Sequence, residues 1–161
     1  MKKLSSDDQD FELWILLSHT RNAITKLREQ ELEEFNVSPQ QSAILHLLET
    51  AEDNITPAKV SRRFFREPHS VSELISRMEK RGLVKRMKDL PRKNMVRIVL
   101  TDEGHDIYQR SKRARKPVLR IMSKLSNEQR EQLRLFLTIL QDAAVDEIEQ
   151  AYKSRFHWTL S

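Results

Sequence analysis

The sequence predicts a mainly α-helical protein with one small β-hairpin, and three features of its 161 residues indicate this fold class. Glycine occurs only twice while 33% of the residues are charged, which favours long helices over many tight turns. Apolar residues recur at helical spacing through most of the chain, often after a Ser or Thr that can cap a helix. Residues 83–100 instead hold two short β-prone runs around a polar turn.

The first part of the chain is expected to form helices at 10–34, 39–49 and 57–65. The first of these is apolar on nearly all sides, and such a helix is either central to a core or shared with a second chain. The second and third each open with a hydroxyl side chain followed by proline, at Ser38 and Thr56. This pair indicates a helix start, because the hydroxyl caps a free N–H and proline needs no partner there.

A further helix is expected over residues 70–81. Ser70 and Glu73 have the spacing of a capping box, in which each side chain accepts a hydrogen bond from the backbone of the other residue. Gly82 then ends the helix, because glycine readily takes the left-handed conformation that follows a last turn. One apolar face follows at helical spacing and is expected to be buried; it consists of Val71, Leu74, Ile75 and Met78.

The hairpin is expected from the runs 83–87 and 95–100, with Pro91 in the turn between them. Proline is tolerated in such a turn and would not be in a central strand. Two helices should follow the hairpin. One begins after Thr101 and is kinked or split by Pro117.

A second capping box at Ser126 opens the last helix. The outer helices, 10–34 and 126–160, carry more apolar surface than one small lobe can cover. We therefore expect them to pack against a second copy of the chain.

Charge is unevenly distributed along the chain. Residues 56–124 carry 20 basic and 7 acidic side chains, a net charge of +13, whereas residues 1–55 carry −6 and residues 125–161 carry −2. A basic centre between acidic ends is typical of a surface that binds a polyanion. A membrane-surface role is disfavoured, because Trp14 and Trp158 both lie in the acidic ends rather than beside the basic residues.

Composition also excludes several classes of chemistry. The chain has no cysteine, so disulfides, thiolate nucleophiles and thiol sensors are excluded. Its two glycines, 22 residues apart, cannot form a phosphate-binding loop, and its five histidines include no pair at i and i+4. We expect no metal, no cofactor and no enzyme activity. The longest apolar run, Leu13–Leu17, has five residues where a membrane span needs roughly 20, and no signal region is visible, so a cytoplasmic protein is expected.

The order of elements and two motifs resemble the MarR family of winged-helix transcription regulators. The motifs are EKRGLVKR at 79–86 and VRIVLTDEG at 96–104, and the resemblance spans roughly residues 10–150. It implies a single MarR-type domain, 1–161, with a winged helix-turn-helix lobe at 38–101. The dimerisation helices would be 10–34 and 102–160. The chain departs from the family at Phe65, where a small residue is common, and at the wing tip, where the family often has Asp-x-Arg.

By this resemblance, the helix at 70–81 enters the DNA major groove and the wing follows the phosphate backbone into the minor groove. Arg77 is the best candidate for a bidentate contact to guanine. Glu73 could accept from cytosine, although its capping role competes, and the nearby serines could contact phosphate rather than bases. The expected DNA-contacting residues are His69, Ser70, Ser72, Glu73, Ser76, Arg77, Lys80, Arg86, Lys88, Arg92, Lys93, Asn94 and Arg97.

Family members commonly respond to a small ligand, and Trp14, His19, His46 and Tyr108 could line its pocket or could simply be core residues. The favoured interpretation is a homodimeric regulator of transcription, a repressor more than an activator, that binds a palindromic operator in double-stranded DNA. One alternative is a winged helix used for protein interaction or DNA architecture without sequence-specific binding. Another is double-stranded RNA, whose narrow major groove would not admit the helix.

Overall fold

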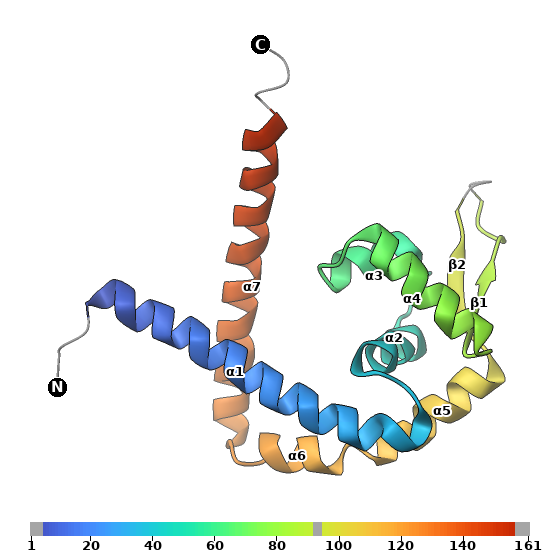
Figure 1. Cartoon of the computed structure of the whole chain (residues 1–161), viewed down its shortest axis with the longest axis horizontal. Helices are drawn as coiled ribbons and strands as arrows, with labels where there is room; N and C mark the ends of the chain where they lie inside the picture. Colours follow the sequence, from blue (N-terminus) through green and yellow to red (C-terminus); the bar gives the residue numbers. More distant parts are fainter. Residues whose placement is uncertain (1–4, 92–94, 157–161) are drawn as a thin grey trace. The chain divides into compact units, whose positions relative to one another are not determined.

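The structure, a computed structural model, describes residues 5–91 and 95–156, with side chains described up to residue 151. Compact packing divides the chain after Val118 into two units, which we describe separately. The elements in chain order (Figure 1) are α1 (Ser6–Leu32), the 3-10 turn η1 (Glu33–Phe35), α2 (Pro39–Thr50), α3 (Pro57–Arg63), α4 (Pro68–Lys80), β1 (Val84–Met87), β2 (Arg97–Leu100), α5 (Asp102–Arg113), α6 (Lys116–Met122) and α7 (Asn127–Phe156). The predicted fold class, mainly helical with one antiparallel hairpin, is confirmed.

Hydroxyl side chains cap the N-termini of α2, α3, α5 and α7 at the residues that the sequence predicts. Ser38 Oγ accepts from the backbone N–H of Gln41 at 3.2 Å, and the Gln41 side chain returns a bond to Ser38 N at 3.0 Å. Thr56 accepts from the third backbone N–H after it at 3.3 Å, and Thr101 does the same at 3.0 Å. Ser126 accepts from its third successor at 3.2 Å. These local bonds satisfy N–H groups that a helix leaves free at its start.

Two helix starts differ from the prediction, and the helices predicted to end at residues 34 and 65 end two residues earlier, at Leu32 and Arg63. The predicted capping box at Ser70 and Glu73 is wrong, because α4 begins at Pro68 and makes Ser70 its third residue. Proline fixes the backbone angle of a first helical residue, so Pro68 starts the helix instead of interrupting the chain. The helix predicted from residue 10 begins at Ser6, because Ser5 and Asp8 form a capping box that the prediction missed. The split expected at Pro117 is confirmed: α5 ends at Arg113, and α6 follows.

Both glycines lie where α4, the hairpin and α5 meet. Gly82 has φ +70° and closes α4, with its N–H bonded to the Glu79 carbonyl at 2.9 Å. The N–H of Leu83 bonds to the Met78 carbonyl at 3.0 Å, which completes the reverse turn that commonly ends helices. A Cβ on Gly104 would lie only 1.9 Å from the Leu83 carbonyl oxygen. Only glycine therefore allows α5 to pack this closely on the start of the hairpin.

The core of the first unit lies between α2, α4, α5 and the hairpin, and Figure 1 shows α2 at its centre. The hairpin pairs Val84 with Leu100 and Met87 with Arg97. The N–H of Ile98 also bonds to the carbonyl of Ile55 at 2.7 Å, which attaches the hairpin to the segment before α3. This packing fixes the position of α4 relative to the hairpin.

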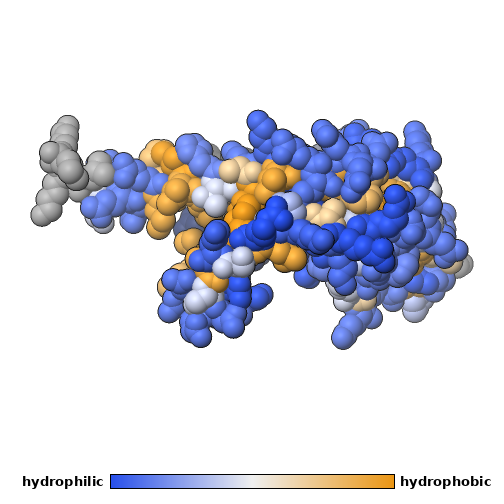
Figure 2. Space-filling view, turned by 90° about the horizontal axis from the view of Figure 1, so that it is seen from below, coloured by the Kyte–Doolittle hydropathy of each residue, from blue (hydrophilic) through white to orange (hydrophobic). Residues whose placement is uncertain are grey.

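The outer helices bury little of their apolar surface within one chain. Among the side chains described from 119 to 151, none is buried. Exposed large hydrophobic residues on α7 include Leu135, Phe136 and Leu140, and those on α1 include Phe11 and Trp14. Figure 2 shows hydrophobic side chains gathered at the surface along α1. None of the described helices is long and apolar enough to cross a membrane.

A partly buried ion pair joins α1 to the rest of the first unit. Arg28 and Glu31 pair at 2.6 Å, and their side chains are only 14% and 6% exposed. Arg28 also donates to Ser42 Oγ at 3.3 Å and to the Ser111 carbonyl at 3.4 Å. Glu31 accepts from the backbone N–H of Val118 at 3.2 Å. One ion pair thereby connects α1 with α2, α5 and Val118, the last residue of the first unit.

Replacing Arg28 by Met should lower the free energy of unfolding by about 3 kcal/mol, because Glu31 would remain buried without its cation. Chemical denaturation measures this change. The control is Arg21→Met, an exposed position on α1, where a change below about 0.5 kcal/mol is expected. Equal effects of the two substitutions would contradict the role assigned to the Arg28–Glu31 pair.

Candidate nucleic-acid interface

Helix α4 has one buried face and one exposed polar face. Its predicted apolar face is buried in the core, and the residues between those positions point outward. His69 and Ser70 are exposed in the first turn. Ser72 and Glu73 are exposed in the second turn, and Arg77 is exposed with Lys80 in the last turn. The structure therefore brings six of the thirteen residues predicted to contact DNA onto one exposed surface of one helix.

Glu73 does not cap the helix, contrary to the role considered for it. Its carboxylate lies 3.1 Å from Nε2 of His69, one turn earlier on the same face. Both side chains are largely exposed, at 59% for Glu73 and 85% for His69. The carboxylate is therefore accessible as a hydrogen-bond acceptor for a group that approaches α4 from outside.

Arg86 on β1 is turned toward α4 and bonds three of its residues. Its guanidinium pairs with the Glu79 carboxylate, and it donates to Ser76 Oγ at 3.1 Å and to the Ser72 carbonyl at 3.4 Å. The backbone N–H of Arg86 also donates to Glu79 at 3.2 Å. Glu79 is not among the residues predicted from the sequence, although Ser72, Ser76 and Glu79 have the i, i+4, i+7 spacing of one helix face.

A second arginine, Arg97, forms an ion pair with Asp89 in the described part of the wing. Arg97 donates from Nε to Asp89 at 2.7 Å and from Nη2 to the other carboxylate oxygen at 2.6 Å. These bonds hold the pKa of Asp89 below its usual range and raise that of Arg97, because each stabilises the charged form of its partner. Lys88, next to this pair, is exposed. The wing-tip candidates lie outside the described residues; they are Arg92, Lys93 and Asn94.

Helix α3 adds cations that are not among the predicted DNA-contacting residues. Lys59, Arg62 and Arg63 line a shallow hollow of about 360 Å³ together with Ile55 and Asp53. Lys59 pairs with Asp53 and lowers the pKa of that carboxyl group. Arg62 and Arg63 are exposed. They lie on the helix that, in a helix-turn-helix, crosses the DNA backbone.

Two of the four candidate ligand-pocket residues, His46 and Tyr108, lie within hydrogen-bond distance of each other. Nδ1 of His46 lies 3.1 Å from the hydroxyl of Tyr108, which is 2% exposed. Burial lowers the pKa of His46, and the positive charge of Arg115, which lies over the Tyr108 ring, lowers it further. The neutral imidazole is therefore favoured at pH 7. Trp14 and His19 are exposed on α1.

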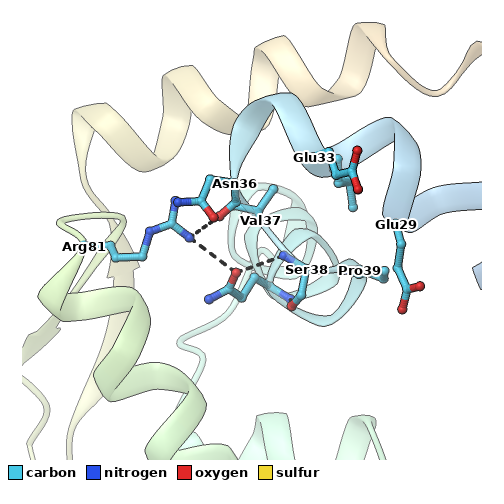
Figure 3. Close-up of a pocket in the computed structure, with 9 residues that line it drawn as sticks. Glu29, Glu33, Asn36, Val37, Ser38, Pro39 and Arg81 are labelled. Atoms are coloured by element: carbon cyan, nitrogen blue, oxygen red, sulfur yellow. Dashed lines mark hydrogen bonds between the residues drawn. The ribbon is translucent and has the colours of Figure 1, made fainter. Parts of the chain in front are cut away.

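A larger hollow of about 450 Å³ lies between the end of α1, the start of α2 and the end of α4. Figure 3 shows Arg81 reaching toward Asn36 on one side, with Glu29 and Glu33 on the other. Arg81 donates to the carbonyl of Asn36 and also lies 3.5 Å from the side-chain oxygen of Gln41. The four candidate pocket residues line neither this hollow nor the one beside α3.

The sequence and structure are similar to known transcription regulators. The sequence model described as MarR family matches residues 35–91. The organohalide-sensing transcriptional regulator RdhR, solved with 2,4-dichlorophenol, is 31% identical; the alignment covers 89% of this chain and 87% of that chain, with a TM-score of 0.72. The chain belongs to the MarR family of transcription regulators.

More distant structures share the fold of this MarR-family chain. A complex of S. aureus MepR with DNA is 23% identical, covers 87% of this chain and 99% of that one, and has a TM-score of 0.72. The regulator BldR from Sulfolobus solfataricus is 18% identical, covers 86% and 99% of the two chains, and has a TM-score of 0.73. No protein with a curated description matches the sequence. The family and winged-helix fold expected from the sequence are thus confirmed.

The turn between α3 and α4 is unusual in this MarR-family chain. Phe65 has φ +49°, in the left-handed region, and its side chain is 55% exposed. That backbone conformation costs a residue with a Cβ roughly 1–2 kcal/mol, which explains why a small residue is common at this point in the family. The turn is held by the N–H of Arg66, which bonds to the carbonyl of Ser61 at 3.0 Å.

Phe65→Gly should raise the free energy of unfolding by less than about 1 kcal/mol, because glycine removes the cost of the left-handed conformation but also the burial of a ring that is 55% exposed. Denaturant unfolding measures the change. Asn36→Gly is the matched control, since Asn36 also has a positive φ of 52° but asparagine tolerates it better. A decrease in stability for Phe65→Gly would show that packing of the ring outweighs the strain.

Proposed function

We propose that this MarR-family protein binds double-stranded DNA in the cytoplasm as a homodimer. In this proposal it represses transcription from a two-fold-symmetric operator, is released by a small molecule, and acts through binding without catalysis. The observation that carries the proposal is the exposed polar face of α4, held in place by the core and flanked by the hairpin. The B-DNA major groove is wide enough for one helix of this kind.

The chemistry of that face fits the base edges of DNA. Arg77 is exposed in the last turn of α4, and a guanidinium can donate two hydrogen bonds to O6 and N7 of guanine. Glu73 can accept from the amino group of cytosine. Lys88, Arg62 and Arg63 provide exposed charge for phosphate groups on either side. S. aureus MepR, which has this fold, is solved in complex with DNA, and that supports the proposal.

A homodimer accounts for the exposed apolar surface of the outer helices. A helix as long as α7, with no buried side chain among those described up to residue 151, needs a partner to be stable. A two-fold symmetric pair also presents two copies of α4, which fit successive major grooves about 34 Å apart. This symmetry is the basis for proposing a palindromic operator.

The proposed release by a small molecule rests on the relative RdhR, which is solved with 2,4-dichlorophenol. Aromatic compounds with one ionisable hydroxyl are therefore the first ligands to screen. In this chain, His46 and Tyr108 are the candidate pocket residues that already share a hydrogen bond.

The proposal is tested by selecting bound duplexes from a random-sequence pool and measuring affinity at two salt concentrations. We expect one enriched sequence with two-fold symmetry and half-sites about one helical turn apart. Strong salt dependence with no enriched sequence would contradict the proposal and favour an architectural role. Absence of DNA binding would favour a protein-interaction module.

Arg77→Ala should reduce the ratio of affinities for the selected and a scrambled duplex by about 10- to 100-fold, because a bidentate contact to guanine would be lost. Fluorescence anisotropy on both duplexes gives the ratio. Arg134→Ala, which removes the same charge from α7, should leave the ratio unchanged. If the ratio stays constant for Arg77→Ala as well, Arg77 does not read the sequence.

Leu140→Glu should convert the dimer to monomers at micromolar concentration, because symmetry would bury two carboxylates in an apolar interface. Light scattering should give a molar mass near the 19.1 kDa of one chain instead of twice that value. Thr138→Glu, on the opposite side of α7, should remain dimeric. A monomeric wild-type protein, or a dimer unaffected by Leu140→Glu, would contradict the proposed interface.

A further inference from the structure

We infer that Arg86 does not contact DNA but positions α4, and that Glu79 is the essential partner of Arg86. The inference rests on the proposed function and concerns how α4 reaches its target. We refer to the side chains of Arg86, Glu79 and Ser76, together with the Ser72 carbonyl, as the Arg86 clamp. The sequence alone places Arg86 among the DNA contacts, and Glu79 has no assigned role in that interpretation.

The hydrogen bonds of the Arg86 clamp use most of the N–H donors of the Arg86 guanidinium. One terminal nitrogen pairs with the Glu79 carboxylate, and the other donates to Ser76 Oγ at 3.1 Å and to the Ser72 carbonyl at 3.4 Å. The Arg86 and Glu79 side chains are 29% and 36% exposed, so both are largely covered. The bonded groups extend over two turns of α4, from Ser72 to Glu79. Such a set of bonds restrains both tilt and rotation of the helix relative to β1.

Moving Arg86 to a phosphate would carry a large cost. It would break the bonds to Ser76 and Ser72 and leave the Glu79 carboxylate without its cation. That carboxylate would then lie near a polyanion, where like charges repel. Arg77 and Lys80 are exposed on the same helix and can meet phosphates or bases without such a loss. The geometry therefore separates cations that hold α4 from cations that face outward.

The two roles of Arg86 predict opposite effects of Glu79→Gln. If Arg86 contacts a phosphate, removing Glu79 frees it and removes a repelling charge, so specific binding strengthens. If Arg86 positions α4, removing Glu79 loosens the helix, so binding to the selected duplex loses its advantage over a scrambled one. Positioning also predicts an unchanged slope of log affinity against log salt for Arg86→Gln, whereas loss of a phosphate contact lowers the slope by about 1.

The experiment measures Arg86→Gln, Glu79→Gln and the double variant in the full-length protein. The probes are the duplex enriched by the wild-type protein and its scrambled version, each at several salt concentrations. We expect each single variant to lower the affinity ratio about 10-fold, and the double variant to lower it no further, because both changes disable the same contact. Lys85→Gln, an exposed neighbour on β1, controls for the loss of one positive charge and should leave the ratio unchanged.

The outcomes separate this inference from the proposed function. If the wild-type protein enriches no duplex, the proposed function fails and the inference fails with it. If a duplex is enriched but Glu79→Gln keeps or raises the ratio, or Arg86→Gln lowers the salt slope, only the inference is overturned. Should either variant unfold at the assay temperature, Ser76→Ala removes one bond of the Arg86 clamp. It should lower the ratio by a smaller factor at constant salt slope, and no change in the ratio would overturn the inference.

Discussion

The close approach of α5 to the backbone of Gly82 and Leu83 is the contact on which the arrangement of the winged helix-turn-helix lobe depends. Here α4 ends, β1 begins, and the Leu83 carbonyl accepts from the N–H of Thr101 at 3.2 Å. Gly104 fits only because it lacks a side chain. Since three elements meet within a few residues, the direction of α4 and the position of the hairpin are set together. Substitution at Gly104 would disturb both at once, because a side chain there would meet the Leu83 carbonyl.

Charge in the basic centre of the chain serves two purposes. Some cations are used inside the fold: Arg81 bonds to the turn before α2, Arg86 to α4, and Arg97 to Asp89. Others, including Arg77 and Lys88, are exposed. The net charge of +13 over residues 56–124 therefore overstates the number of cations that can meet a phosphate group. It still contributes to the long-range field that attracts a polyanion, because this field depends on total charge rather than on individual contacts.

Local signals made much of the fold predictable from the sequence. Ser38, Thr56 and Thr101 mark helix starts, because a cap requires only residues within the same turn. Pro68 misled the prediction of α4, since proline is read both as a break and as a first helical residue. The family was predictable from two motifs around the hairpin.

The pairing of Arg86 with Glu79 was not predicted, since it depends on how β1 folds back along α4. In the same way, sequence identifies the exposed polar face of α4 but not which cations are already engaged. His46 and Tyr108 were two of the four residues predicted as possible lining of a ligand pocket. Their contact requires the packing of α2 on α5, which the sequence alone does not give.

None of the side chains described in the second unit, from residue 119 to 151, is buried, and this has a consequence for gene control. If association supplies the free energy that orders α7, the protein's melting temperature rises with its concentration. Operator occupancy would then grow with about the square of monomer concentration while most chains are unpaired. A modest change in the amount of protein in the cell would thus produce a steeper change in transcription. The apolar surface left uncovered in one chain would in this way set a threshold for the regulator's action.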